Sequence, residues 1–307
     1  MTYFPISIPF LASCLSFYIC YTQAKLHHHN HHHDHDHHEN RHMHPSPSNA
    51  PYTCYGDGIF DVREFGAIGD GVEDDTNAFK KAWDCVCLSQ THSPILWVPH
   101  GYSFIIQSTI FKGPCQSPLI FQVDGTLMPP DGPKSWPKNN NRHKWLVFYR
   151  INQMTIKGRG LIDGRGQQWW NLPCKPHKSP NGSTLPGPCD SPIAVRFVMC
   201  TNLKLQELKI KDSPYFNLRF DRCVRVRIES LSITAPASSP NTDGIHIENT
   251  NDVRIYNSFI SNGDDCVSIG SGCFDVDIKN ITCVHGHGIS IGMIGASLML
   301  VVAISTF

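Results

Sequence analysis

The chain has 307 residues, enough to bury a large core in one long domain or in two. Lysine and arginine together number 26, as do aspartate and glutamate, so the formal charge is zero with histidine neutral. This balance excludes the strongly basic class of nucleic-acid-binding proteins, and no nucleic-acid partner is expected.

The N-terminal segment is almost wholly apolar between residues 4 and 20. Thr22–Ala24 resembles a small-residue cleavage site, so residues 1–24 are predicted to be a secretory signal peptide. A short membrane anchor is the alternative, because the segment lacks the usual N-terminal positive charge. Removal of residues 1–24 leaves 11 of the 13 cysteines, which suits an oxidising compartment. Glycosylation acceptors at Asn181 and Asn280, usable only after secretion, agree with an extracellular protein.

Residues 25–53 form a histidine-rich segment that is predicted to be a disordered linker. Residues 27–44 hold 11 of the 18 histidines, and the proline-rich stretch Pro45–Pro51 follows. No apolar period runs through the segment, so it cannot fold alone. Two other interpretations stay open. Clustered imidazoles bind transition metals, and a tract that is neutral near pH 7 but positive near pH 5 could bind an acidic polymer.

Residues 54–292 are predicted to form one all-β domain whose only good helix lies near its start. Asp75 can cap this helix. The helix would cover the open end of a solenoid, as terminal caps do. Its apolar face is built from residues at helical spacing: Ala78, Phe79, Ala82, Trp83 and Val86.

The rest of the domain repeats short runs in which apolar and polar residues alternate, the pattern of strands with one buried face. Three series recur at a period of 20 to 30 residues, which predicts a parallel β-helix with three strands per coil. Asparagines fall at the expected bends, where this residue tolerates left-handed backbone. They are Asn202, Asn251, Asn257 and Asn280. Nothing between residues 195 and 292 has the pattern of a helix.

Acidic residues and one histidine lie almost one repeat apart, each just before a strand-like run. They are Asp243, the pair Asp264 and Asp265, and His287. Equivalent positions of successive coils stack at about 4.8 Å, so these side chains are expected to meet in one patch. Crowded carboxylates resist full ionisation, so one can stay protonated in mild acid. The group has the composition of an acid/base active site.

These residues belong to segments that resemble the motifs of plant polygalacturonases, inverting glycoside hydrolases of the pectin-degrading, right-handed parallel β-helix superfamily. The segments are Ser239–His246, Gly263–Cys266 and Gly286–Gly292. The resemblance covers about residues 59–292 and implies hydrolysis of α-1,4-galacturonosidic bonds in pectin by a secreted enzyme of the plant cell wall. A related hydrolase of rhamnogalacturonan or xylogalacturonan, or a catalytically dead pectin-binding β-helix, stays open as an alternative.

The resemblance also implies roles for individual residues. Asp264 would be the general acid, Asp243 and Asp265 would hold the attacking water, and His287 would maintain the acid's hydrogen bonding. A disulfide between Cys266 and Cys283 is implied by the family pairing. No cofactor or metal is expected, although the acids with His287 could hold a cation. A monomer without stable membrane insertion, acting on homogalacturonan, is expected.

The C-terminal part departs from the family pattern. Val284 and His285 replace the usual Gly-Pro after Cys283, and neither Arg nor Lys follows Lys279, so the Arg-Ile-Lys motif that binds the substrate carboxylate is absent from the given sequence. Residues 293–307 form an atypical apolar tail, short for a membrane span. These features predict that C-terminal coils are missing, and hence little activity for the chain as given. These departures from the family pattern keep open the alternative of a catalytically dead pectin-binding β-helix.

Overall fold

The computed structural model describes residue 54 and residues 57–136, 142–172, 177–178, 184–185, 191–292 and 300–303. These residues belong to one compact unit, residues 51–307. The predicted signal peptide, the histidine-rich segment and the acceptor Asn181 lie outside the described residues. Within the described ranges, no helix has the length and apolar character needed to cross a membrane.

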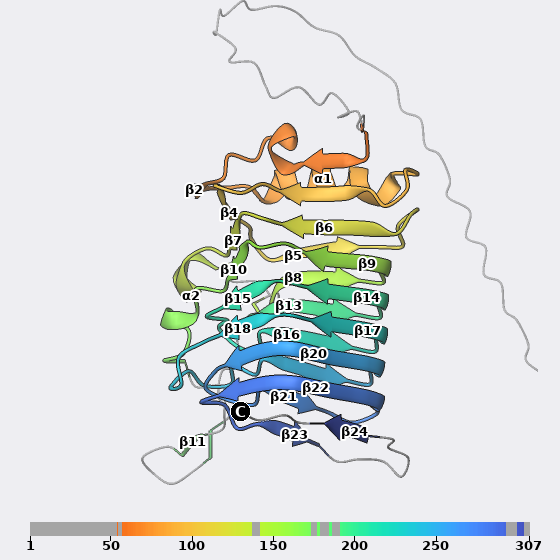
Figure 1. The fold of residues 1–307 in the computed structure, drawn as a ribbon. Helices are drawn as coiled ribbons and strands as arrows, with labels where there is room; N and C mark the ends of the chain where they lie inside the picture. Colours follow the sequence, from red (N-terminus) through yellow and green to blue (C-terminus); the bar gives the residue numbers. More distant parts are fainter. Residues whose placement is uncertain are drawn as a thin grey trace, which may run out of the picture. The chain divides into compact units, whose positions relative to one another are not determined.

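Two parallel sheets form the unit, and Figure 1 shows their strands stacked in successive coils. The larger sheet contains β1 (Ile59–Asp61), β2 (Asp70–Asp74), β3 (Ile95–Val98), β4 (Ser103–Ile105), β6 (Leu119–Val123), β7 (Thr126–Met128), β9 (Asn152–Lys157), β10 (Leu161–Asp163), β14 (Thr201–Gln206), β15 (Lys209–Lys211), β17 (Val224–Glu229), β18 (Ser232–Thr234), β20 (Asn251–Ser261), β22 (Phe274–Val284) and β24 (Leu300–Ala303). The smaller sheet contains β5 (Thr109–Lys112), β8 (Lys144–Tyr149), β13 (Ile193–Val198), β16 (Leu218–Asp221), β19 (Ile245–Glu248), β21 (Val267–Ile269) and β23 (Ile289–Ile291).

The larger sheet bends around a corner and supplies two faces of each coil. Strand β20 shows how, because its first half pairs with β17 and its second half pairs with β18. The smaller sheet supplies the third face. The predicted parallel β-helix with three strands per coil is therefore confirmed, and the three series of alternating runs are the three faces.

A few elements lie outside this repeat. They are the helices α1 (Thr76–Leu88) and α2 (Gly132–Ser135), the 3-10 turns η1 (Val62–Phe65) and η2 (Gly166–Gln168), and the antiparallel pair β11 (His177–Lys178) and β12 (Thr184–Leu185). Strand β24 lies in the predicted apolar tail and pairs in parallel with β22. The described part of that tail thus extends the sheet.

The cap helix forms where it was predicted, and its apolar face is buried. The capping role of Asp75 was wrong, because its carboxylate turns back to accept a hydrogen bond from the Ile68 backbone N–H at 2.6 Å. The Asp74 carboxylate instead accepts from the Thr76 backbone N–H at 2.9 Å. Burial raises the pKa of Asp75, as expected for a carboxyl placed inside the coil.

Left-handed residues mark the corners of the coils. Asn202, Asn257 and Asn280 have φ of 54°, 51° and 54°, as predicted. At the fourth corner the prediction was one residue off, because Asp252 has φ of 54° and Asn251 does not adopt the left-handed conformation. Aspartate tolerates this backbone for the same reason as asparagine, since its short polar side chain can bond locally.

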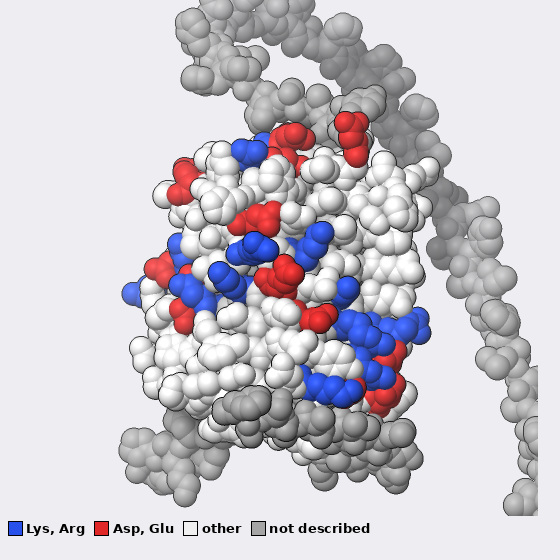
Figure 2. Space-filling model, viewed as in Figure 1, with Lys and Arg blue, Asp and Glu red and all other residues white. Residues whose placement is uncertain are grey.

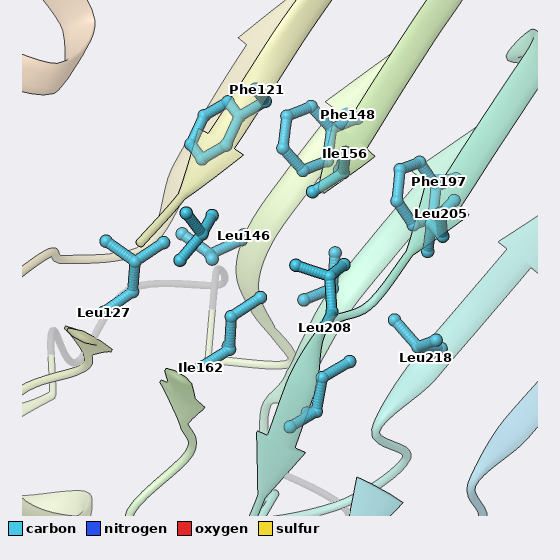
Figure 3. Close-up of a pocket in the computed structure, with 13 residues that line it drawn as sticks. Phe121, Leu127, Leu146, Phe148, Ile156, Ile162, Phe197, Leu205, Leu208 and Leu218 are labelled. Carbon is cyan, nitrogen blue, oxygen red and sulfur yellow. The ribbon is translucent and has the colours of Figure 1, made fainter. Parts of the chain in front are cut away.

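Side chains that point inward stack from coil to coil. The rings of Phe148 and Phe197 lie 5.2 Å apart, and those of Phe197 and Phe220 lie 4.8 Å apart. Figure 3 shows Phe148 between Phe121 and Phe197 in this row of rings. Burial of such apolar surface contributes about 25 cal/mol per Å². The stack therefore fixes the strands of the smaller sheet that lead to the acids.

Candidate active site

Three successive turns of the smaller sheet carry the predicted site residues. Ile245, Val267 and Ile289 are aligned across the sheet, because Ile245 pairs with Val267 and Val267 pairs with Ile289. Asp243, Asp265 and His287 each lie two residues before one of these positions, in the same order. Parallel strands lie about 4.8 Å apart, so the register alone brings the three turns together. In Figure 1 the strands β21 and β23 that follow two of these turns lie side by side.

Three of the four predicted residues, Asp264, Asp265 and His287, form one cluster at this edge. Asp243 lies on the adjacent turn, which a hydrogen bond of 2.9 Å from the Gly244 backbone N–H to the Asp265 carbonyl joins to the cluster. The His287 Nδ1 atom lies 3.2 Å from Asp264 Oδ1 and 3.9 Å from Asp265 Oδ1. The side chain of His287 is 66% exposed, whereas those of Asp264 and Asp265 are 15% and 20% exposed. The arrangement leaves the imidazole facing solvent and the acids at the floor of the cluster.

Asp243 is the most enclosed of the three acids, with 5% of its surface exposed. Burial raises the pKa of its carboxyl, the charges of Asp264 and Asp265 raise it further, and a hydrogen bond to His246 opposes the rise. The His246 Nδ1 atom lies 3.4 Å from Asp243 Oδ2. The ring of His246 stacks on Phe216 at 4.5 Å, which holds the imidazole in place.

A buried asparagine ties two of the turns together. The Asn262 side chain is fully buried, and its Nδ2 donates to the backbone carbonyl of Thr242 at 2.8 Å and to that of Asp265 at 2.8 Å. Asn217 acts from the preceding coil, where its Nδ2 donates to the carbonyls of Thr242 and Asp243, both at 3.1 Å. The two amides link the backbone of the acid-bearing turns across three coils.

Glycine stands at two motif positions for a steric reason. A Cβ at Gly263 would lie 2.1 Å from the Ser239 carbonyl oxygen, and one at Gly286 would lie 2.5 Å from Asn262 Oδ1. Real Cβ atoms do not approach so closely. Glycine at these positions lets neighbouring turns pack against one another and so brings their acids together.

Two further contacts complete the site. The Ser290 hydroxyl donates to Asp265 Oδ2. A disulfide joins Cys266 to Cys283, the pairing that the family resemblance implies. Two more disulfides, Cys54–Cys85 and Cys87–Cys115, lie at the opposite end of the coils, beside the cap helix.

Sequence reasoning found the acids and His287 but missed Asn217, Asn262 and Ser290, and it gave His246 no role. Ser290 could have been found, because it is the outward residue of β23 in register with His246 and Ser268. The asparagines gave no signal, since their function depends on backbone carbonyls that no side-chain pattern records.

The cluster has the donor atoms for a cation as well. Among the described residues, the ligand atoms of Asp264, Asp265 and His287 lie within 4.8 Å of one another. Exposed acidic groups of this kind are common without an ion. The same atoms also suit proton transfer, which needs an acid and a base in reach of one bond.

Known proteins are similar to this chain in sequence. The chain is 43% identical over 237 residues to a polygalacturonase of Cryptomeria japonica, covering 77% of this chain and 45% of that protein. It is 43% identical over 235 residues to a polygalacturonase of Persea americana, covering 76% and 48%. The chain therefore spans about half the length of these relatives.

Solved structures share the fold at lower identity. An exopolygalacturonase of Thermotoga maritima superposes with a TM-score of 0.58 at 21% identity, covering 77% of this chain and 63% of that one. An endo-xylogalacturonan hydrolase of Aspergillus tubingensis gives a TM-score of 0.60 at 22% identity, covering 78% and 61%. The family model for glycosyl hydrolases family 28 matches residues 87–303. On this match and the identity to plant polygalacturonases, the chain belongs to glycosyl hydrolases family 28.

Proposed function

We propose that the protein hydrolyses α-1,4-galacturonosidic bonds in de-esterified pectin with inversion at the anomeric carbon. The observation that carries the proposal is the meeting of Asp243, Asp264, Asp265 and His287 on three stacked turns. An inverting glycosidase needs one carboxylic acid to protonate the leaving oxygen and one carboxylate to activate water. The cluster supplies both kinds of group.

The roles are those that the family resemblance implies, and the contacts of each acid are compatible with them. Asp264 donates its proton to the glycosidic oxygen, and His287, at 3.2 Å, keeps the acid oriented by hydrogen bonding. Asp265, held by Ser290, and Asp243, held by His246, position the water and accept its proton as it attacks.

The raised pKa of Asp243 sets a condition on this mechanism. Asp243 acts as a base only when it is ionised, and burial shifts its ionisation to a pH above the ordinary range for aspartate. Activity should therefore rise with pH through the Asp243 ionisation.

The Asp264→Asn variant tests the proposal. In a protein extended to the full length of the plant relatives, we expect release of reducing ends from polygalacturonate, and we expect Asp264→Asn to lose nearly all of this activity, because the amide keeps the shape but cannot protonate the leaving oxygen. Proton NMR of the first product should show the inverted anomer. Activity of Asp264→Asn near the wild-type rate would assign the acid elsewhere. Binding without release of reducing ends by the wild type would identify a pectin-binding protein instead.

The site of action is part of the same proposal. We infer secretion to the plant cell wall, supported by three disulfides, which form and persist in oxidising compartments. The acceptor Asn280 is exposed at a corner of the coil and is open to glycosylation. Mass spectrometry of protein from a plant secretome, with and without glycosidase treatment, tests both points.

A further inference from the structure

Two adjoining hollows lie on the larger sheet, at the corner where β6, β9 and β14 turn into β7, β10 and β15. Their volumes are about 450 Å³ and about 400 Å³, within the range of small-ligand sites. Both are lined by Asp124 and Arg159, so they form one continuous groove, which we call the corner groove. The acids lie at a different corner, where β18 and β20 lead to the smaller sheet.

Glycines leave the backbone of this corner bare. A Cβ at Gly125 would lie 2.3 Å from the Pro99 carbonyl oxygen, and one at Gly160 would lie 2.1 Å from the Gly125 carbonyl oxygen. Glycine therefore lets these coils pack closely at the corner. The next coil turns instead at Glu207, which has φ of 56° and is exposed. The glycines thus form a recess between charged side chains, in which a ligand can approach the backbone.

The charged groups of the corner groove are not paired with one another. Its cations are Lys157, Arg159 and Lys209, and none of them makes an ion pair with a residue that the structure describes. Glu207 lines the groove as well, and it too makes no ion pair within the described part of the chain. The groove therefore offers both positive and negative groups to a ligand, with the cations in excess.

Other side chains of the corner groove are held in place. Asp124 Oδ2 accepts hydrogen bonds from Trp97 Nε1 at 3.0 Å and from Gln122 Nε2 at 2.7 Å. Tyr102, which lines the groove, is fixed by Arg63, whose guanidinium lies 4.7 Å from the ring centroid and donates to the hydroxyl at 2.9 Å. Side chains that are fixed in advance lose less conformational entropy when a ligand binds. The wall of the groove is therefore preorganised for binding.

The rest of the same face provides a comparison. Figure 2 shows acidic and basic side chains interspersed over the face formed by the larger sheet. Farther along this face the charges are paired, as in Arg227 with Asp252 at 2.9 Å and Lys279 with Asp277 at 2.7 Å. Such exposed pairs contribute little to stability, but they occupy both partners. The corner groove differs from these pairs because its charged groups are left for a ligand.

We propose that the corner groove is a second carbohydrate site, which binds a uronate-bearing oligosaccharide independently of the acids. A uronate has a carboxylate, hydroxyl groups and an apolar ring face. The planar guanidinium of Arg159 matches a carboxylate through two parallel hydrogen bonds. The carboxylates of Asp124 and Glu207 accept hydrogen bonds from sugar hydroxyls, and Tyr102 offers a ring to the apolar face. The inference requires no step of the proposed hydrolysis, because the groove and the acids lie at different corners.

The test compares two double variants of the full chain. Both carry Asp264→Asn as well, so that the ligand is not cleaved. The groove variant is Lys157→Gln with Arg159→Gln, which removes two charges from the corner groove. The control variant is Lys80→Gln with Arg222→Gln, which removes one exposed lysine from α1 and one exposed arginine that follows β16.

NMR of the Trp97 indole N–H measures binding at the groove itself. This N–H donates to Asp124, which lines the groove, so a ligand bound there should shift its signal. Trp97→Phe assigns the signal among those of the 6 tryptophans. The ligands are the galacturonate hexamer and the galactose hexamer, which has the same length but no carboxylates. Agreement of the unbound spectra of the two double variants away from the substituted positions shows that both are folded.

We expect the galacturonate hexamer to shift the Trp97 signal of the control variant and to bind the groove variant at least about tenfold more weakly, since a charge-assisted contact corresponds to about that factor. Equal affinity of the two variants overturns the proposal, as does an unmoved Trp97 signal in the control. Binding of the galactose hexamer as tight as that of the galacturonate hexamer overturns the choice of a uronate. Reducing-end release is a separate measurement, so failure of the proposed hydrolysis leaves this result unchanged.

Discussion

Replacement of Asn262 by alanine should disturb the alignment of the acids while leaving the acids themselves in the chain. The side chain is fully buried and donates two hydrogen bonds of 2.8 Å, to the carbonyls of Thr242 and Asp265. Neither carbonyl is left without a donor after the substitution. Thr242 keeps the bond from Asn217 Nδ2, and Asp265 keeps the bond from the Gly244 backbone N–H at 2.9 Å.

The expected loss of stability is therefore that of two ordinary hydrogen bonds, about 2 kcal/mol. For a domain of this size, that corresponds to a fall in Tm of roughly 4–8 °C. The substitution should also lower the catalytic rate. The turn of Asp243 and the turn of Asp265 would no longer share a donor, and small misplacements of reacting groups cost up to about a hundredfold in rate. We expect kcat to fall at least about tenfold with KM nearly unchanged.

Calorimetric unfolding and reducing-end release from polygalacturonate measure the two effects. Asn251→Ala is the matched control, because Asn251 also bonds the next coil, accepting from the Phe274 backbone N–H at 3.1 Å, but on the larger sheet. A wild-type kcat in folded Asn262→Ala would refute the alignment role. An unchanged Tm would show that the two bonds contribute nothing to stability.

Three further predictions use other parts of the chain. Burial raises the pKa of Asp243, so its stabilising protonated form is present below the unfolded pKa and is lost as pH rises through the folded pKa. Asp243→Asn should therefore raise Tm more at pH 7 than at pH 4. Equal gains in Tm at both pH values would contradict this. Serine at both Cys266 and Cys283, which are 17 residues apart, should cost about 3 kcal/mol in the chain-entropy model, measured by denaturant unfolding; alkylation of both thiols in the folded wild type would show that the bond is absent. Deletion of residues 25–50 should weaken retention on polygalacturonate at pH 5 but not at pH 7, because imidazoles are charged only in acid; equal retention of both proteins at pH 5 would leave the histidine tract as a linker.

The strand repeat and the acids could be predicted from the sequence because both have a period. Alternation of apolar residues marks the buried face of each strand, and one residue of slip would move every side chain to the other face. The alternating runs around Leu203, Val226 and Ile255 therefore indicate which side chains of each strand face the core. Once the coils were aligned, Asp243, Asp265 and His287 fell at equivalent positions.

Other features had no period to reveal them. Asp75 was expected to cap a helix, but a carboxylate can accept from any nearby N–H, and the loop at Ile68 competes for it. The left-handed corner at Asp252 was missed because aspartate and asparagine share the same backbone tolerance. Lys112 of β5 and Lys144 of β8 line one hollow of the smaller sheet but are distant in sequence, so only the sheet shows them as neighbours.

The segment between β10 and β13 shows how such a protein can change length without losing its active site. It runs from residue 164 to residue 192 and includes the antiparallel strands β11 and β12, yet β13 still pairs with β8 in register, Val195 opposite Leu146. Each coil takes its height from the backbone ladder, so a segment inserted at a corner leaves the register of the next strand unchanged. Evolution can therefore lengthen or rebuild the corners while the spacing of the acids stays fixed by the sheet.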